Sequence, residues 1–372
     1  MSRSFVFWQN IISIHQTAFL ETLSVKCKVT LIVESPLSPD RAESGWRIPE
    51  MVNVEIISSP SKEEIDQLLE LHQKAVHVFS GIDAYPLVFH AFRKAVNKRM
   101  RIFIYAEPYD STGIKGLLKH LKYRFLNFKY GHRISAFLAT GKLGRKCYTR
   151  AGFKHVFEWG YFTKNRQSLP ETGRKNAHSQ KPVLLYIGQF IKRKKIVEFL
   201  KTAVHLTDLF EHFYLVGQGN LLQKVENTVA KASNMTCLGV IPNEELPEIM
   251  SHCDILILPS AFDGWGAVVN EALQCGIRVI CSDACGAATL LDHQSRGGTF
   301  SWNAPQEPEK TLLRWLEKGN VTEKERKEIA LWARTHISGD AACGYFLEIC
   351  EYVNGDRVDI PQTPWKTAPT GK

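Results

Sequence analysis

The chain has 372 residues, of which 44% are hydrophobic and 23% are charged. This length and composition exclude a disordered chain and suffice for two domains that each bury a core. The net charge of +9 favours an anionic partner, which could be nucleic acid, an anionic membrane surface or a phosphorylated small molecule. No apolar run approaches the roughly 20 residues that cross a bilayer, so we expect no transmembrane helix.

The nine cysteines are scattered along the sequence. They form no Cys-x-x-Cys pair and no Cys/His cluster with the spacing of a zinc site. Near the N-terminus, Gln9 and Asn10 interrupt the apolar residues and no small-residue cleavage site follows, so we predict no signal peptide. Reduced thiols in the cytoplasm are therefore the expectation.

Short β-rich apolar runs alternate with helical patterns in the first half of the chain. The predicted strands are residues 5–8, 29–33, 54–57, 76–79, 101–105 and 136–140. The predicted helices between them are residues 14–23, 62–71, 84–96 and 142–151. This alternation is typical of βαβ units and predicts a parallel sheet.

Residues 114–133 (IKGLLKHLKYRFLNFKYGHR) contain six Lys or Arg residues and no acid. Their apolar residues recur at helical spacing, which predicts a basic amphipathic helix. Such a helix suits an anionic membrane surface, where each basic residue contributes about 1 kcal/mol. A helix that packs on the first sheet with its polar face in water is the alternative, and the sequence leaves both open.

Residues 163–181 are polar, contain Pro and Gly, and form the best linker candidate. The alternation then restarts, with predicted strands at residues 183–187, 213–216, 236–238, 255–258 and 279–281. The predicted helices are residues 195–207, 221–231, 244–252, 267–274, 306–318, 323–336 and 341–353. These elements predict a second doubly wound α/β domain of about equal size.

The predicted organisation is an N-terminal domain (1–165), a linker (166–181), a C-terminal domain (182–338), and a last helix with a tail (339–372). A return of this helix to the first domain is one of its two possible placements. Ligands of open α/β sheets bind at the carboxyl ends of the strands. A cleft between two such domains is therefore the expected active site.

The strongest chemical signal follows the strand at 255–258. Glycines in the loop that follows, Gly264 and Gly266, would let backbone amides approach an anion, and the next helix adds positive charge at its N-terminus. Asp263 lies at the loop tip and Glu271 lies eight residues further on, so two carboxylates could hold hydroxyls at two ends of a nucleotide-sugar. Taken alone, such residues are more often a loop acid and a solvated helix acid.

Residues 263–280 resemble the donor motif of family 4 retaining glycosyltransferases, in which two glutamates separated by seven residues precede an EA(L/M)xxGxPVI run. Asp263 stands where the family has the first glutamate, and Glu271 matches the second. The loop variant Asp-Gly-Trp-Gly is similar to that of bacterial surface-polysaccharide transferases.

The resemblance extends over the second domain. Residues 186–194 (YIGQFIKRK) are similar to the family's first-strand motif, in which Lys194 matches the phosphate-binding Lys and Gln189 replaces the usual Arg. Residues 216–219 (VGQG) match the family's VGxG turn, and residues 239–242 (GVIP) match the loop that meets the nucleotide base. Outside this context, Lys194 would be one of several solvated cations, and Cys285-Gly286 is either the last phosphate loop or a tight structural turn.

The resemblance implies a GT-B fold, with two Rossmann-like domains facing a central cleft, and a retaining glycosyltransferase. It implies that Asp263 holds sugar hydroxyls, Glu271 ribose hydroxyls and Lys194 the diphosphate. The other implied donor-binding residues are Gly188, Gln189, Arg193, Gly217, Val240, Ile241, Gly264, Trp265 and Gly266. No Asp-x-Asp triplet occurs in the chain, so we expect no metal and no other cofactor, with protein charges stabilising the departing diphosphate.

The first domain departs from the family because it lacks a Gly-rich loop after its first strand. His15 and Gln16 open a helix at the expected cleft edge, where they contact an acceptor or serve as helix-capping or core residues. Glu107 follows the strand at 101–105, where relatives often carry a sugar-contacting His. It either replaces that residue or is structural.

We therefore expect transfer of a sugar, from a UDP-sugar by default, to a saccharide or lipid-linked acceptor of a polysaccharide or lipopolysaccharide. The expected location is the cytoplasm, with peripheral binding to the inner face of the cytoplasmic membrane as an option. A GT-B nucleotide-sugar epimerase and a non-catalytic nucleotide-sugar-binding protein are the alternatives. No recognisable DNA or RNA module supports a nucleic-acid partner.

Overall fold

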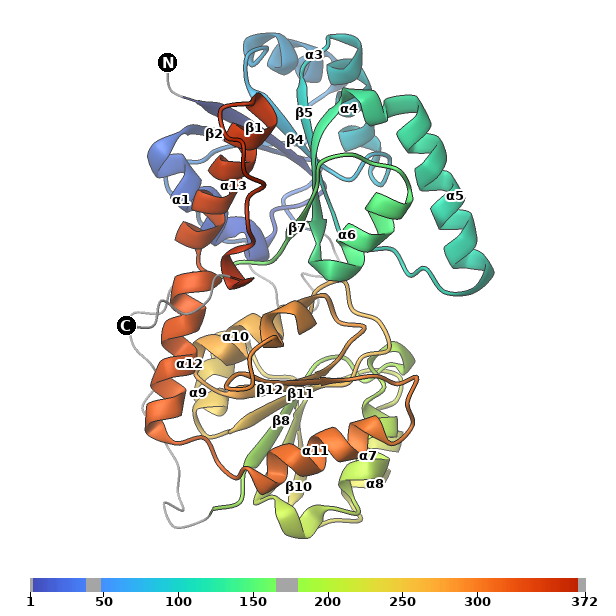
Figure 1. Cartoon of the computed structure of the whole chain (residues 1–372), viewed down its shortest axis with the longest axis vertical. Helices are drawn as coiled ribbons and strands as arrows, with labels where there is room; N and C mark the ends of the chain where they lie inside the picture. Colours follow the sequence, from blue (N-terminus) through green and yellow to red (C-terminus); the bar gives the residue numbers. More distant parts are fainter. Residues whose placement is uncertain (1–2, 38–47, 165–179, 367–372) are drawn as a thin grey trace. The chain divides into compact units, whose positions relative to one another are not determined.

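The computed structural model describes residues 3–37, 48–164 and 180–366 (Figure 1). The chain forms two compact units, each built on its own parallel sheet. Unit 1 consists of Met1–Lys164 and His336–Lys372, and unit 2 consists of Asn165–Thr335. The prediction of two doubly wound α/β domains is confirmed. The linker expected at 166–181 lies outside the described residues except for its last two positions.

The sheet of unit 1, over the residues that the structure describes, has seven parallel strands in the order β3-β2-β1-β4-β5-β6-β7. They are β1 (Ser4–Gln9), β2 (Lys28–Val33), β3 (Glu55–Ser58), β4 (Val76–Ser80), β5 (Arg101–Ala106), β6 (Ile134–Thr140) and β7 (Val156–Trp159). β2 and β3 are added in turn on one side of β1, whereas β4 pairs with β1 on its other side. This reversal creates a switch point, where open α/β sheets bind ligands at the carboxyl ends of their strands.

Helices cover both faces of this sheet, with α1 and α13 on one side and α4 and α6 on the other (Figure 1). The helices of unit 1 are α1 (Ile14–Lys26), α3 (Lys62–Leu71), α4 (Pro86–Asn97), α5 (Gly113–Tyr130), α6 (Gly141–Arg150) and α13 (Gly339–Asn354). Residues of β1 alternate between the faces, as expected for a strand buried on both sides. Phe5 and Phe7 contact Phe346 of α13, whereas Trp8 lies in the core cluster beneath α4.

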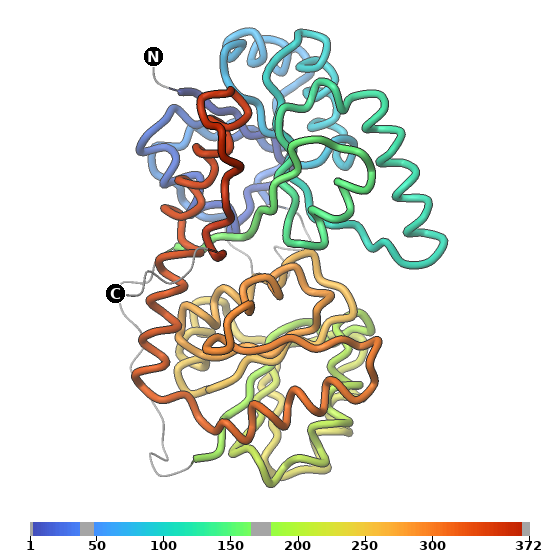
Figure 2. The backbone as a smooth tube through the Cα atoms, viewed as in Figure 1, coloured from blue at the N-terminus to red at the C-terminus, as the bar shows by residue number. Residues whose placement is uncertain are grey.

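The last helix of the chain, α13, is part of unit 1. Its Phe346 lies among the rings of Phe5, Phe7, Phe19, Phe103 and Trp159, with centroid distances of 5.1 to 6.1 Å. A side chain at Gly339 would overlap the carbonyl oxygen of Ala18, so the start of α13 packs directly on α1. Figure 2 shows this red C-terminal segment beside the blue N-terminal helix.

The sheet of unit 2 has six parallel strands among the described residues, in the order β10-β9-β8-β11-β12-β13. They are β8 (Val183–Ile187), β9 (His212–Val216), β10 (Met235–Gly239), β11 (Ile255–Leu258), β12 (Arg278–Ser282) and β13 (Gly297–Phe300). The helices are α7 (Ile196–Ala203), α8 (Leu222–Val229), α9 (Leu246–Ser251), α10 (Val268–Gln274), α11 (Glu307–Glu317) and α12 (Glu323–His336). The switch point of this sheet lies between β8 and β11.

A buried carboxylate fixes the strands at this switch point. Asp254, which is fully buried immediately before β11, accepts hydrogen bonds from the backbone amides of Val183 and Val321, both at 2.9 Å. The guanidinium of Arg326 lies 3.5 Å from the same carboxylate. Paired in this way, the buried charge joins the start of β8 to the start of β11 and so sets the relative positions of the loops at their far ends.

None of the helices in the described ranges has the length and apolar character required to cross a bilayer.

Candidate functional site

The loops that follow β8 and β11 hold the predicted donor residues, and they lie at the carboxyl ends of the two strands that flank the switch point of unit 2. After β8 come Gly188, Gln189 and a single 3₁₀ turn (Lys192–Lys194). After β11 come Pro259 and the loop that carries Asp263. The topology of the sheet thus brings together two sequence motifs that are about 70 positions apart.

Lys194 and Asp263 form the centre of this site. The Lys194 Nζ lies 2.5 Å from the Asp263 Oδ2, and each side chain is only 14% exposed. The hydroxyl of Ser260 lies 3.4 Å from the same carboxylate oxygen. Because the pair is largely shielded from water, its electrostatic attraction exceeds that of an ordinary surface ion pair. A cation and a carboxylate are therefore fixed side by side.

Arg193 ties the 3₁₀ turn to the Asp263 loop. Its guanidinium donates a hydrogen bond to the carbonyl oxygen of Phe262 at 2.7 Å, and its own carbonyl accepts one from the amide of Ala261 at 2.8 Å. These two bonds hold Lys194 and Asp263 in register. Gln189, which replaces the family's Arg, is exposed at the rim, and its carbonyl accepts a hydrogen bond from the hydroxyl of Tyr186 at 2.9 Å.

Tyr186 lies beneath the site. Burial raises the pKa of its phenol above the ordinary value, and the negative charge of Asp263 raises it further. Tyr186 therefore stays a neutral donor, which keeps the turn at Gln189 in place.

The glycine turn after β9 packs against the turn after β8. Gly217 has a φ of +144°, and a Cβ there would overlap the carbonyl oxygen of Gly188. The amide of Phe190 donates to the carbonyl of Gln218 at 2.8 Å, and the amide of Gly217 donates to that of Gly239 at 2.8 Å. These contacts bring the predicted base loop, with Val240 exposed and Ile241 half-buried, next to the turn after β8 that is predicted to bind phosphate. Only glycine fits Gly217.

The Asp263 loop is supported by the turn that follows β12. The amide of Asp263 donates to Ala284 and its carbonyl accepts from Gly286, both at 3.1 Å. A Cβ at Gly286 would overlap the carbonyl oxygen of Gly264. Gly286 thus permits the close approach that holds the loop, which is the role of a tight structural turn.

The side chain of Trp265 supports the loop from within. It is 1% exposed, and its indole Nε1 donates to the Oδ1 of Asn270 at 2.7 Å. Predicted as donor-binding, Trp265 can reach a ligand only through its backbone. Gly266, with a φ of +94°, then turns the chain into α10, whose first turn carries the half-buried Glu271.

The three acceptor candidates of unit 1 come together at the carboxyl ends of its strands. The ring of His15 stacks on that of Tyr161, with centroids 4.7 Å apart and planes 12° apart. The hydroxyl of Tyr161 donates a short hydrogen bond to Glu107. Tyr105 is hydrogen-bonded to both Gln16 and Tyr161. The sequence provides no spacing signal for Tyr105 and Tyr161, which join residues from three separate elements.

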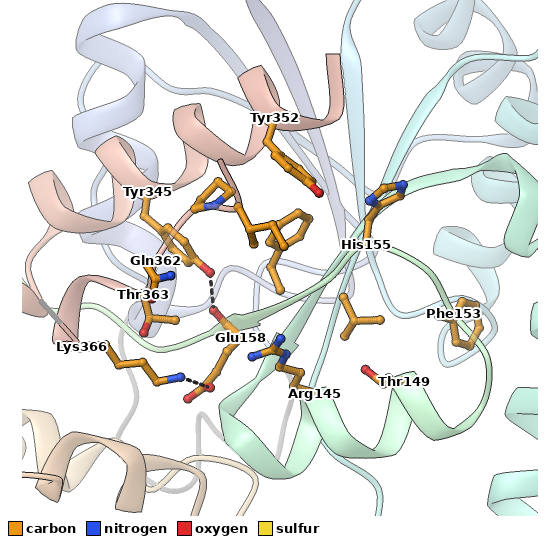
Figure 3. Close-up of a pocket in the computed structure, with 14 residues that line it drawn as sticks. Arg145, Thr149, Phe153, His155, Glu158, Tyr345, Tyr352, Gln362, Thr363 and Lys366 are labelled. Carbon is orange, nitrogen blue, oxygen red and sulfur yellow. Dashed lines mark hydrogen bonds and ion pairs between the residues drawn. The ribbon is translucent and has the colours of Figure 1, made fainter. Parts of the chain in front are cut away.

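A pocket of about 460 Å³ lies elsewhere on unit 1, between the edge strand β7, α6, α13 and the C-terminal segment (Figure 3). Its buried Glu158 lies 3.5 Å from the Nζ of Lys366, and the hydroxyl of Tyr345 donates to the Glu158 carbonyl at 3.1 Å. It includes none of the predicted acceptor residues. These contacts fasten the C-terminal segment to the sheet.

The predicted basic helix, α5, exposes its apolar residues instead of burying them. Its buried residues are Gly116, Leu126 and Tyr130. The opposite face carries the α5 stripe, whose members are between 51% and 85% exposed: Ile114, Leu117, Leu118, Leu121, Phe125 and Phe128. Of the surrounding cations, Lys122 pairs with Asp83 at 2.9 Å. The interpretation in which this helix turns its apolar side to the sheet is wrong.

The described residues contain no group of three or more His, Cys, Asp or Glu side chains that could hold a metal ion.

Comparisons with known proteins show what the sequence of the chain resembles. Residues 170–334 match the family model of the glycosyl transferases group 1. An uncharacterized glycosyltransferase of Methanocaldococcus jannaschii is 30% identical over 131 residues, which are 35% of this chain and 36% of the relative. The N,N'-diacetylbacillosaminyl-diphospho-undecaprenol alpha-1,3-N-acetylgalactosaminyltransferase of Campylobacter jejuni is 28% identical over 122 residues, 32% and 31% of the two chains. The matches span about a third of the length of these curated relatives.

Solved structures share the fold over nearly the whole chain. Anabaena HepE in complex with UDP superposes with a TM-score of 0.69 at 13% identity, covering 94% of this chain and 99% of the other. The lipopolysaccharide outer core galactosyltransferase WaaB superposes with a TM-score of 0.66 at 13% identity, covering 95% and 100%. At this identity the likeness establishes the fold, which is that of the GT-B glycosyltransferases.

Proposed function

We propose that this chain, whose residues 170–334 match the family model of the glycosyl transferases group 1, transfers a sugar from a nucleotide-diphosphate sugar to an acceptor hydroxyl with retention of configuration. The observation that carries the proposal is the shielded Lys194–Asp263 pair at the switch point of unit 2, followed by Glu271 in the first turn of the next helix. Structures of the same fold that contain UDP and UDP-glucose support a UDP-sugar as donor.

The donor would lie along the carboxyl edge of the unit 2 sheet. The diphosphate would contact Lys194 and the backbone of the turns at Gly188 and Gly217. The sugar hydroxyls would meet Asp263, and the ribose hydroxyls would meet Glu271. The base would rest against the loop at Val240. Lys194, Asp263 and the two glycine turns are held by the contacts described above, so this part of the site is formed before the donor binds.

Charge develops on the departing diphosphate as the bond from the anomeric carbon to the phosphate oxygen breaks. The acceptor hydroxyl forms the new bond on the same face, and a diphosphate oxygen takes its proton, so the enzyme supplies no nucleophile. Lys194 stabilises the developing negative charge because it is already oriented and needs no reorganisation. We propose that this charge and the turn amides suffice without a metal ion or other cofactor.

The acceptor is proposed to be a saccharide or a lipid-linked saccharide of a surface polysaccharide or lipopolysaccharide. The named activity of the Campylobacter relative supports a lipid-linked substrate. In unit 1 the joined His15, Gln16 and Glu107 are suited to bind acceptor hydroxyls, with Tyr161 positioning two of them. The stripe and cations of α5 support peripheral binding to an anionic membrane, and nine free thiols support its cytoplasmic face.

The proposal is tested by measuring the transfer of labelled sugar from a donor to an acceptor. Purified protein is incubated with radiolabelled UDP-sugars and a membrane extract as acceptor pool, with EDTA present. We expect label from one UDP-sugar to appear in a polysaccharide or lipid fraction in an α linkage. An altered free nucleotide-sugar without label transfer would instead identify an epimerase, and donor binding without any product would identify a sensor.

A further inference from the structure

A second pocket of unit 1 lies between α5 and α6, beside the α5 stripe. Its volume is about 480 Å³, and Leu117 belongs both to its lining and to the stripe. The cations in its lining are Lys146 and Arg150 of α6, and His120 of α5 also contributes to it. The pocket thus adjoins the exposed apolar surface along one flank of α5.

The wall of this pocket is fixed by its own contacts. A Cβ at Gly116 would overlap the backbone of Ser111, so the loop before α5 packs directly on the helix. The hydroxyl of Tyr109 lies 3.1 Å from the Nδ1 of His120, and its carbonyl accepts a hydrogen bond from the thiol of Cys147 at 3.7 Å. A site that is held in this way needs little ordering when a ligand enters.

The lining of the pocket contains two cations and no carboxylate. Among the residues that the structure describes, neither Lys146 nor Arg150 makes an ion pair, and no carboxylate lines the pocket. The nearby Asp110 accepts two hydrogen bonds from Thr112, at 2.9 and 2.7 Å, which lower the pKa of its carboxyl. Two exposed cations without partners at a concave polar surface suit an anion with several oxygens.

We infer that this pocket binds the phosphate of an anionic lipid headgroup while the α5 stripe lies in the same membrane surface. The inference rests on the proposed membrane role of α5. A helix that lies in the interface buries its apolar face near the acyl boundary, and the phosphates lie at its polar flanks. The pocket is lined by residues of that flank, and its volume of about 480 Å³ admits a terminal phosphate. A phosphate monoester is preferred to a diester because its additional oxygens and charge serve both cations.

The test is cosedimentation of the full chain with phosphatidylcholine vesicles that contain phosphatidic acid or phosphatidylglycerol, adjusted to equal surface potential. The wild type should bind the phosphatidic acid vesicles about tenfold more tightly. Lys146→Gln/Arg150→Gln should bind both vesicles equally. Lys154→Gln/Lys201→Gln, which removes two exposed cations outside the pocket, should keep the preference.

The outcomes separate the two proposals. Equal binding of the wild type to both vesicles, or an unchanged preference in Lys146→Gln/Arg150→Gln, would overturn the phosphate pocket and leave the membrane role. Leu121→Glu/Phe125→Glu, which places charge on the α5 stripe, should lose binding to both vesicles. If it binds like the wild type, or if the wild type binds neither vesicle, the membrane role and the pocket inference both fail.

Discussion

Replacement of Lys194 by Ala is expected to lower kcat about 10²- to 10³-fold, because removal of one preoriented group that stabilises developing charge has effects of this size. The Nζ of Lys194 lies 2.5 Å from Asp263 in a position that is largely shielded from water. In the variant, water could stabilise the departing diphosphate only after it had reoriented around the new charge, and this reorientation costs free energy. Initial rates of UDP release in the presence of the acceptor measure the effect.

The control for this variant is Lys192→Ala, in the same 3₁₀ turn. Lys192 is exposed, so its removal should leave kcat within about twofold, an effect well below 1 kcal/mol. Melting curves of both variants exclude misfolding as the cause. A Lys194→Ala enzyme that keeps wild-type kcat would show that the diphosphate leaves without help from this cation.

Phe346→Ala is expected to lower the free energy of unfolding of unit 1 by about 3 to 5 kcal/mol, the usual cost of deleting a fully buried phenyl ring. Phe346 is 0% exposed and lies among five aromatic rings of β1, α1, β5 and β7. Hydrogen exchange of the β1 and β6 amides measures this loss, because these core strands exchange only when the unit unfolds.

Leu71→Ala on α3 of the same unit is the matched control, since Leu71 is 75% exposed and its removal creates no cavity. Its effect should stay within about 0.5 kcal/mol. Exchange in β1 that is unaffected by Phe346→Ala would mean that α13 contributes little to the stability of unit 1, contrary to its packing.

The sequence predicted most strands because their buried runs are continuous and apolar. β7 and β13 escaped prediction for physical reasons. β7 contains Glu158, a buried carboxylate that interrupts the apolar run by which the other strands were predicted. β13 begins with two glycines, which have low strand propensity, yet a Cβ at Gly297 would overlap the carbonyl oxygen of Val279 on the neighbouring strand.

For the candidate site, the ordered motifs predicted which residues meet, but not how. The direct Lys194–Asp263 contact joins positions 69 apart and arises from the strand order β8-β11, which no local spacing encodes. The sequence likewise does not predict the burial of Trp265, because a Trp between two glycines in a loop is equally compatible with contact to a ligand and with packing in the core. The cluster around Tyr161 depends on the segments that follow β1, β5 and β7 meeting at one edge of the sheet, although these strands are not neighbours in it.

The central claim, a nucleotide-sugar donor site in unit 2, is tested most directly by thermal melts with UDP, GDP, ADP, CMP and their common sugars in EDTA. One diphosphate at 100 times its Kd should stabilise the wild type by about 2.7 kcal/mol. Glu271→Ala should abolish this shift and Asp263→Ala should weaken it. If no nucleotide raises the melting temperature, or if Glu271→Ala keeps the full shift, the donor site is not where the loops after β8 and β11 meet.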